Sequence, residues 1–132
     1  MTSSRIPIVI ADDDHATARS LARLLDVWGF AVEVAHDGRR ALELILHHQP
    51  PLAIIDLHMP EMMGPEVARA ARARGVESKL IAHTGHDDPR LHESAIAAGF
   101  DALFLKPIDS EALLAFIRQV LPHGAISGAG ST

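Results

Sequence analysis

The strongest constraint on the fold is a regular alternation of short apolar runs with segments of helical periodicity. The apolar runs are residues 6–11 (IPIVIA), 30–35 (FAVEVA), 52–57 (LAIIDL), 79–83 (KLIAH) and 102–105 (ALFL). Runs that are apolar on both faces predict buried strands of a parallel sheet with helices on each side. The run 30–35 alternates instead, with Glu33 on its polar side, which predicts a strand nearer the edge of the sheet.

The segments between these runs repeat their apolar residues with the period of a helix. The inward faces predicted by this period are Ala18, Leu21, Leu25 and Trp28; Leu42, Ile45 and Leu46; Val67, Ala70 and Ala71; Leu91, Ala95 and Ala98; and Leu113, Phe116, Ile117 and Val120. Gly29, Gly75 and Gly99 are expected just past three of the helix ends, and Asp88 and Asp109 are expected as N-caps of the last two helices.

Five strand–helix units in succession predict one doubly wound α/β domain with a parallel sheet and right-handed crossovers. We place this domain at residues 6–122, after a lead-in at 1–5 and before a Gly/Ser/Ala-rich tail at 123–132 that we expect to be disordered. In a sheet of this kind the ligand site lies beyond the carboxyl ends of the strands. Functional side chains are therefore expected directly after the apolar runs.

Composition and charge narrow the class of function. The chain of 132 residues contains no cysteine, which removes disulfides and cysteine-ligated zinc. Its net charge of −5 disfavours a nucleic-acid partner, because phosphate binding needs clustered Lys and Arg. The N-terminal segment lacks the pattern of a signal peptide, and no run approaches the roughly 18 apolar residues of a membrane helix. We therefore expect a cytoplasmic protein that does not use a membrane as partner.

Polar side chains stand where four of the apolar runs end. They are Asp12, Asp13 and Asp14 after the first run, Asp56 at the third, Thr84 after the fourth and Lys106 after the fifth. Asp14 also fits the N-cap position of the following helix. Asp56 and Lys106 both lie within apolar segments, so a purely structural buried ion pair is one interpretation of these two residues.

A second interpretation is a site built for a phosphoryl group. Three carboxylates in one cleft repel one another unless a divalent cation lies among them, and hard oxygen ligands suit Mg²⁺. Thr84 adds a hydroxyl donor and Lys106 adds a fixed cation. A carboxylate can itself be the nucleophile that forms an acyl phosphate, while a metal and an ammonium stabilise the transferring group.

The segments that carry these residues resemble the receiver (CheY-like) domain of two-component response regulators. The resemblance runs from about Ile6 to Leu121 and rests on IVIADDD, LAIIDLHMPEMMG, AHTG and GFDALFLKPI in this order. It implies a flavodoxin-like (βα)5 fold with strand order 2-1-3-4-5. It also implies a phosphoacceptor domain that assists its own phosphorylation and dephosphorylation and is not a conventional enzyme. The implied donor is a phosphohistidine of a sensor histidine kinase or of a histidine phosphotransfer protein.

The resemblance assigns the phosphoacceptor and the metal ligands. Asp56 is the implied phosphoacceptor. Asp12 and Asp13 are the implied acidic pair for Mg²⁺, with Asp13 binding directly and Asp12 largely through water. Asp56 itself and the backbone carbonyl of His58 complete the implied ligand set.

The last two apolar runs carry the implied switch residues and one departure from the pattern. Thr84 is the implied switch hydroxyl, and Lys106 is the implied contact to a phosphoryl oxygen, followed by Pro107 after a cis peptide bond. Receivers commonly carry Tyr or Phe three residues before this lysine, whereas this chain has Leu103 there, with Phe104 next to it. Coupling of the threonine to an aromatic ring is therefore in doubt, and a relay or sink of phosphoryl groups is an alternative role.

Two of the nine histidines stand near the implied site. His58 and His86 follow Asp56 and Thr84 by two residues each, which suggests that their side chains flank its entrance and tune the acyl-phosphate lifetime. Most of the other histidines are expected on the surface, without a dedicated transition-metal site.

Other functions and arrangements stay open at this point. A phosphatase of the haloacid dehalogenase type also carries two aspartates spaced like Asp12 and Asp14, but Ala16 stands where that pattern has Thr or Val. A receiver-like interaction module without phosphorylation is a further alternative. The chain is either a stand-alone regulator or the receiver of a longer protein, and we expect a monomer or weak dimer with a partner face on the last two strand–helix units.

Overall fold

Strands and helices alternate along the chain as the sequence predicts. The computed structural model of the chain describes residues 5–121, so the predicted tail at 123–132 lies outside the described residues. The elements are β1 (Pro7–Ala11), α1 (His15–Val27), β2 (Ala31–Ala35), α2 (Gly38–His48), β3 (Leu52–Asp56), α3 (Gly64–Ala73), β4 (Lys79–Thr84), α4 (Pro89–Ala98), β5 (Ala102–Leu105) and α5 (Ser110–Val120). None of the helices within residues 5–121 is both long enough and apolar enough to span a bilayer.

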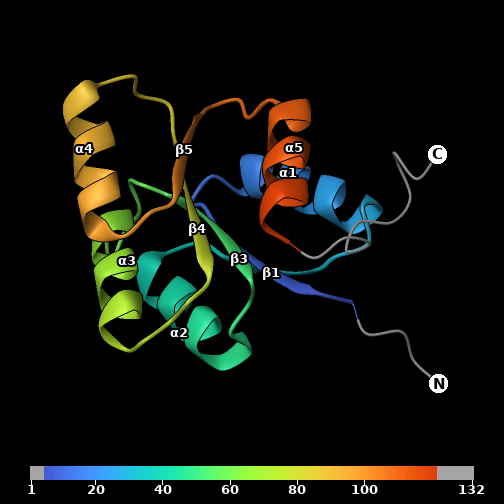
Figure 1. The fold of residues 1–132 in the computed structure, drawn as a ribbon, viewed down its shortest axis with the longest axis horizontal. Coiled ribbons are helices and arrows are strands. Elements are labelled where there is room, and N and C mark those ends of the chain that lie inside the picture. The colour runs from blue at the N-terminus through green and yellow to red at the C-terminus, as the bar shows by residue number, and fades with distance from the viewer. Residues whose placement is uncertain (1–4, 122–132) are drawn as a thin grey trace.

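The five strands form one parallel sheet with the order β2-β1-β3-β4-β5 (Figure 1). This is the flavodoxin-like α/β topology that the resemblance implies. β2 is an edge strand, as the alternation around Glu33 predicts. β5 is the opposite edge, and its apolar sequence is therefore only half-buried, with Leu105 41% exposed.

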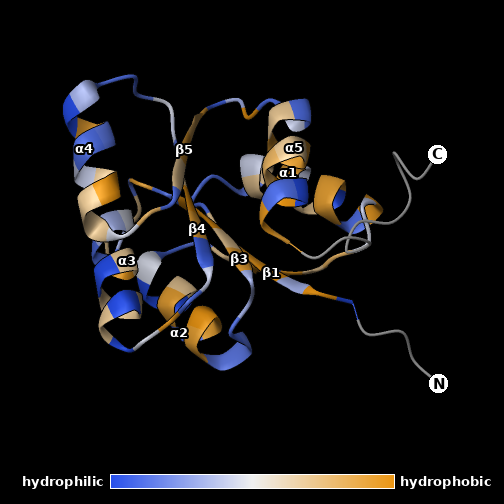
Figure 2. Cartoon of the chain, in the orientation of Figure 1, coloured by the Kyte–Doolittle hydropathy of each residue, from blue (hydrophilic) through white to orange (hydrophobic). Residues whose placement is uncertain are grey.

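Helices cover both faces of the sheet and create two separate apolar layers. α1 and α5 lie on one face, and α2, α3 and α4 lie on the other (Figure 1). Successive residues of a strand point to opposite faces, so Ile54 enters the first layer and Ile55 the second. The central strands are mostly apolar, with polar residues towards their ends, whereas the outer helix surfaces are largely hydrophilic (Figure 2).

Two of the predicted helix faces are shifted in the structure. In α2 the buried residues are Ala41, Leu44 and Ile45, whereas Leu42 and Leu46 are only half-buried. Leu42 and Leu46 are spaced four residues apart on the margin of the stripe centred on Ala41 and Ile45. In α3 the buried residues include Val67, Ala68 and Ala71, whereas the predicted Ala70 is only half-buried.

The predicted helix ends are confirmed, with one qualification at α1. Asp88 and Asp109 are N-caps whose side chains accept the backbone N–H of the second residue after them, at 2.9 and 3.0 Å. Asp14 occupies the N-cap position of α1, but its carboxylate accepts the Thr17 hydroxyl and no backbone N–H. The Asp14 side chain is therefore not part of the buried carboxylate group.

Leu103 and Phe104 pack on opposite faces of β5. Leu103 contacts the layer formed with α2, α3 and α4. Phe104 contacts the layer formed with α1 and α5, where its ring lies edge-on to Phe116 with 6.0 Å between centroids. Since neighbouring strand residues alternate in direction, the Phe104 ring does not fill the place of an aromatic residue at position 103.

The loop between β3 and α3 passes close to the start of α2. The Gly38 N–H donates to the Pro60 carbonyl at 3.2 Å. A Cβ atom on Gly38 would lie only 1.8 Å from the Met62 carbonyl oxygen, so no larger residue fits without moving the backbone. Gly38 therefore fixes how closely the loop that follows Asp56 can approach the second layer.

We expect Gly38→Ala to lower the free energy of unfolding by about 2 kcal/mol or more, because the added methyl group displaces this loop. Gly85→Ala is the matched control, since a Cβ there meets no atom within 4 Å, and its effect is expected to stay within about 0.5 kcal/mol. Urea unfolding followed by the fluorescence of the single tryptophan, Trp28, measures both. Equal effects of the two substitutions would contradict the steric account.

Candidate functional site

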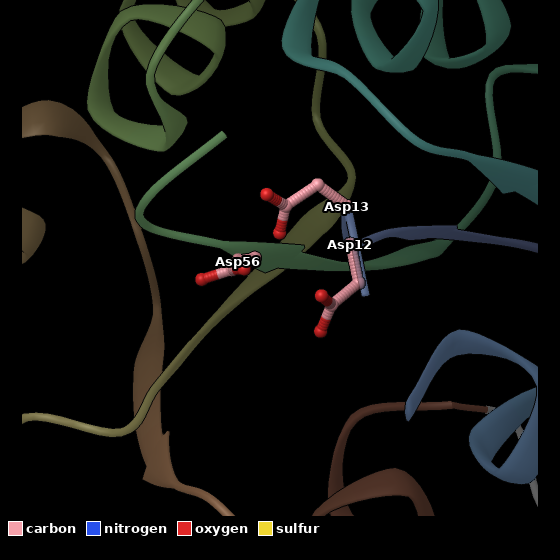
Figure 3. Close-up of side chains that lie close together, drawn as sticks. All are labelled: Asp12, Asp13 and Asp56. Atoms are coloured by element: carbon pink, nitrogen blue, oxygen red, sulfur yellow. The ribbon is translucent and has the colours of Figure 1, made fainter. Parts of the chain in front are cut away.

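Three carboxylates meet at the carboxyl ends of β1 and β3. Asp12 and Asp13 directly follow β1, and Asp56 is the last residue of β3. One oxygen from each lies within 4.8 Å of the others, and Figure 3 shows the three side chains gathered at this edge of the sheet. Asp12 and Asp56 are buried, at 2% and 5% exposed, whereas Asp13 is exposed. The group therefore has a buried floor and one ligand open to solvent.

Backbone amides hold the two buried carboxylates in place. The Asp14 N–H donates to Asp12 Oδ1 at 2.9 Å, and the His58 N–H donates to Asp56 Oδ1 at 3.1 Å. Both amides lie in the loops that follow the strands, two residues beyond the carboxylate they bind. The backbone of the loop after each strand thus orients the carboxylate at the end of that strand.

Lys106 connects the same two carboxylates from β5. Its Nζ lies 3.0 Å from Asp12 Oδ2 and donates to Asp56 Oδ2 at 3.2 Å. The predicted pairing of Asp56 with Lys106 is therefore present, but the cation is shared with a second acid. Desolvation of buried charges offsets most of the attraction in such pairs, so this arrangement is weak support for a purely structural role.

The charge balance of the site favours a cation. Burial is the largest cause that raises the pKa of Asp56, and the nearby negative charge of Asp12 raises it further. The hydrogen bond from the His58 N–H acts in the opposite direction. Burial opposes the charge of Lys106, but bonding to Asp12 and Asp56 outweighs it and raises the lysine pKa. Three carboxylates and one ammonium leave −3 + 1 = −2. Clustered hard oxygens with this charge, one of them exposed, fit a divalent ion such as Mg²⁺.

Thr84 and Lys106 are neighbours at the carboxyl ends of β4 and β5. The Lys106 backbone N–H donates to the Thr84 carbonyl at 2.7 Å, and the Lys106–Pro107 peptide bond is cis, as the resemblance implies. Thr84 is fully buried, and its hydroxyl accepts the His86 N–H at 3.1 Å. The structure thus brings Thr84 to the correct edge of the sheet while its hydroxyl is held by the following loop.

His58 and His86 lie side by side on the loops after β3 and β4. Their ring centroids are 5.2 Å apart and their planes are nearly perpendicular. Both residues are exposed. Each backbone N–H binds a predicted site residue, Asp56 in one case and Thr84 in the other. The two side chains therefore form an exposed pair that belongs to the same loops as the site.

His83 is the residue that the sequence interpretation missed. The sequence predicts it only as the end of the strand run 79–83; in the structure it is 2% exposed and its Nε2 has no hydrogen-bond partner. Burial, followed by the positive charge of Lys106, lowers the pKa of His83 to about 4. Its position inside the apolar run 79–83 was the available signal, because a polar residue within a central strand is buried whatever its type.

The low pKa of His83 predicts a pH dependence of stability. The unfolded chain takes up a proton near pH 6.5, whereas folded His83 stays neutral down to about 4. The free energy of unfolding is therefore expected to fall as the pH drops from 6.5 towards 4, by about 2–3 kcal/mol from this residue. Urea unfolding without divalent ions at pH 7 and pH 5 tests this.

His83→Leu removes the titrating group and should flatten that part of the profile. His92→Leu is the control, because His92 is exposed on α4 and its replacement should leave the wild-type slope unchanged. Parallel profiles for the wild type and His83→Leu would show that His83 is not responsible.

Comparison with known proteins agrees with this geometry. The family model of the response regulator receiver domain matches residues 8–118. The response regulator MprA of Mycolicibacterium vanbaalenii is 37% identical over 116 residues, which are 88% of this chain and 50% of the relative. The chain thus spans about half the length of the curated relatives it matches.

Solved structures give the same result for the fold. A CheY-like receiver domain protein from Methanospirillum hungatei has a TM-score of 0.82 at 31% identity, covering 88% of this chain and 93% of that one. Chemotaxis protein CheY4 of Vibrio cholerae also has a TM-score of 0.82, at 27% identity, covering 89% of this chain and all of that one (100%). With the family model spanning most of its length, the chain belongs to the receiver domain family of two-component response regulators.

Proposed function

We propose that this receiver domain accepts a phosphoryl group on Asp56 from a phosphohistidine, with Mg²⁺ as cofactor, and thereby switches its contacts with other proteins. One observation carries the proposal: Asp56 lies at the end of β3 with Asp12, Asp13 and Lys106 converging on it. The ligands proposed for Mg²⁺ are Asp12, Asp13, Asp56 and the backbone carbonyl of His58. When bound, the ion would supply positive charge against the carboxylates and the transferring phosphoryl group.

In this mechanism Asp56 is the nucleophile. A bond forms between a carboxylate oxygen and phosphorus while the phosphorus–nitrogen bond of the donor histidine breaks. The His58 N–H holds Oδ1 and the Lys106 ammonium binds Oδ2, so the carboxylate is oriented before the donor arrives.

Lys106 and Thr84 are the groups proposed to bind the transferred phosphoryl group. The ammonium of Lys106 already lies beside Asp56, so a short movement brings it to a phosphoryl oxygen. The Thr84 hydroxyl, whose oxygen accepts the His86 N–H, would donate its own proton to a phosphoryl oxygen. Because the group stays on the protein, the domain is a phosphoacceptor that assists its own reaction and is not a conventional enzyme.

The proposed partners follow from the donor chemistry. They are a sensor histidine kinase or a histidine phosphotransfer protein, with a downstream protein target of unknown identity. The proposal includes action in the cytoplasm as a monomer or weak dimer, without nucleic acid or membrane contact by this domain. Relatives such as MprA are about twice as long as this chain, so their complete activities are not transferred to it.

Phosphorylation of Asp56 is tested by incubation with acetyl phosphate and Mg²⁺ and by mass spectrometry of the product. We expect one labile phosphoryl group on the wild type and none on Asp56→Asn, because an amide lacks the nucleophilic carboxylate oxygen. Asp37→Asn is the control, since this residue only caps α2 and asparagine caps equally well.

The same experiment separates the alternative functions. A folded but unmodified wild type would favour an interaction module without phosphorylation. Steady hydrolysis of phosphate esters that depends on Asp12 but not on Asp56 would favour the haloacid dehalogenase type of phosphatase.

The exposed His58 and His86 pair is proposed to tune the lifetime of the acyl phosphate. We expect His58→Ala and His86→Ala each to change the rate of phosphoryl loss several-fold, because these exposed rings stand on the loops that hold Asp56 and Thr84 and bear on the access of water. His92→Ala, an exposed histidine on α4, is the control. Unchanged decay rates in both variants would leave the pair without this role.

A further inference from the structure

Two histidine rings are stacked beside the carboxylate group, and the proposed mechanism does not use them. His15 is the first residue of α1, and His36 directly follows β2. Their ring centroids lie 3.7 Å apart, and the two ring planes differ by only 8°. His36 is half-buried, whereas His15 is exposed. The stack therefore joins the start of α1 to the loop after β2 and covers one face of the His36 ring.

The His36 ring is hydrogen-bonded to the backbone of the acidic pair. Its Nδ1 lies 3.0 Å from the Asp12 carbonyl oxygen. A carbonyl oxygen only accepts hydrogen bonds, so Nδ1 carries the hydrogen and donates it. One residue earlier, the Ala35 carbonyl accepts the Asp12 N–H at 3.0 Å. Both backbone polar groups of Asp12 are therefore bonded to the consecutive residues 35 and 36.

The bond to the Asp12 carbonyl bears directly on Asp13, the exposed carboxylate of the group. A peptide unit is planar, so a restraint on the Asp12 carbonyl also orients the plane that leads to the Asp13 Cα. The carboxylates of Asp12 and Asp56 are each held by a loop amide and by Lys106. Within residues 5–121 no hydrogen bond or ion pair holds the Asp13 carboxylate. Its position in the group therefore depends on its rotamer and its backbone.

The stack with His15 restrains the ring that makes this bond. A histidine side chain turns about two single bonds, and a half-buried ring has solvent on one side. With the His15 ring nearly parallel at 3.7 Å, turning His36 away from the Asp12 carbonyl would also break the contact between the rings. His15 stands two residues after Asp13, so the bond and the stack together restrain the segment 12–15 at both of its ends.

We propose that His36 is a positioning residue for the divalent-cation site: its Nδ1–H holds the Asp12–Asp13 peptide so that both carboxylates face one ion. The inference rests on the proposed function, because it needs Mg²⁺ to bind this group. His36 is assigned no contact with the ion or with the phosphoryl group. Replacing groups that orient metal ligands without touching the metal typically lowers metal affinity by about 10- to 100-fold.

Two substitutions at position 36 separate the hydrogen bond from the ring. Asparagine keeps a nitrogen donor on Cγ, as in Nδ1 of histidine, but has no ring. Phenylalanine keeps a ring that can stack on His15 but has no donor. We expect His36→Phe to weaken binding of the ion about tenfold and His36→Asn to stay within about twofold of the wild type. A ring needed only for packing would give the reverse order, which overturns the proposal, as would equal affinities of the two variants.

The affinity is measured on the unphosphorylated chain by electron paramagnetic resonance, with Mn²⁺ as the probe and Mg²⁺ as the competitor. No phosphoryl donor is present, so the result does not depend on turnover. His47→Phe is the control, because His47 lies edge-on to His48 near the end of α2 and its replacement should leave the affinity unchanged. Urea unfolding without metal checks that each variant is folded.

Nitrogen NMR of His36 tests the hydrogen bond in the wild type, and so does not need any variant to fold. At pH 8 we expect the ring to be protonated on Nδ1, both with and without Mg²⁺. A neutral ring protonated only on Nε2 has no hydrogen to donate to the Asp12 carbonyl, and this result would contradict the proposal.

Failure of the inference is distinguishable from failure of the proposed function. A folded wild type that binds neither Mn²⁺ nor Mg²⁺ contradicts the metal site of the proposed function itself. A wild type that binds the ion, together with His36→Phe of the same affinity, contradicts only the role of His36.

Discussion

The shared cation of Lys106 is the interaction on which the site depends. Asp12 and Asp56 are buried side by side at the ends of β1 and β3, where two ionised carboxylates without a cation would repel each other in poor solvent. The Lys106 ammonium, directly after β5, lies 3.0 Å from Asp12 Oδ2 and 3.2 Å from Asp56 Oδ2. The parallel sheet makes this possible, because it brings the carboxyl ends of three strands that are distant in sequence to one edge.

One ammonium compensates two buried carboxylates, so any new anion at this site changes the interactions of all three groups. The lysine ammonium has three N–H donors and lies beside two buried carboxylates, so a phosphoryl oxygen on Asp56 would share the same cation with them. A resident divalent ion and a new phosphoryl group change the charge balance around the same ammonium. On the proposed mechanism, phosphorylation therefore redistributes bonds among Asp12, Lys106 and their neighbours, with the two strand-end amides of Asp14 and His58 as fixed points.

The order of elements and the acidic edge of the sheet could be predicted from sequence, because strand-end positions follow from periodicity alone. The register of the buried helix stripes was less certain, and in α2 it lies on Ala41 and Leu44 because small residues carry little periodic signal. The apolar run 79–83 indicates the burial of His83, but its unpartnered Nε2 depends on which groups the sheet brings beside it, and the sequence does not contain that. The steric limit at Gly38 depends on a loop contact between distant segments, which no local pattern contains.

The side of the sheet on which these groups lie bears on how phosphorylation is read out. Leu103 faces the layer of α2, α3 and α4, and it has no ring that could change position there. His83 and Lys106 line the cavity beside α1 and the β5–α5 connection. Phe104, two residues before Lys106, packs on that same α1–α5 face. When Lys106 binds a phosphoryl oxygen, the first side chains to adjust are those against α1 and α5. In this chain the internal response to phosphorylation is therefore expected to begin on the α1–α5 face.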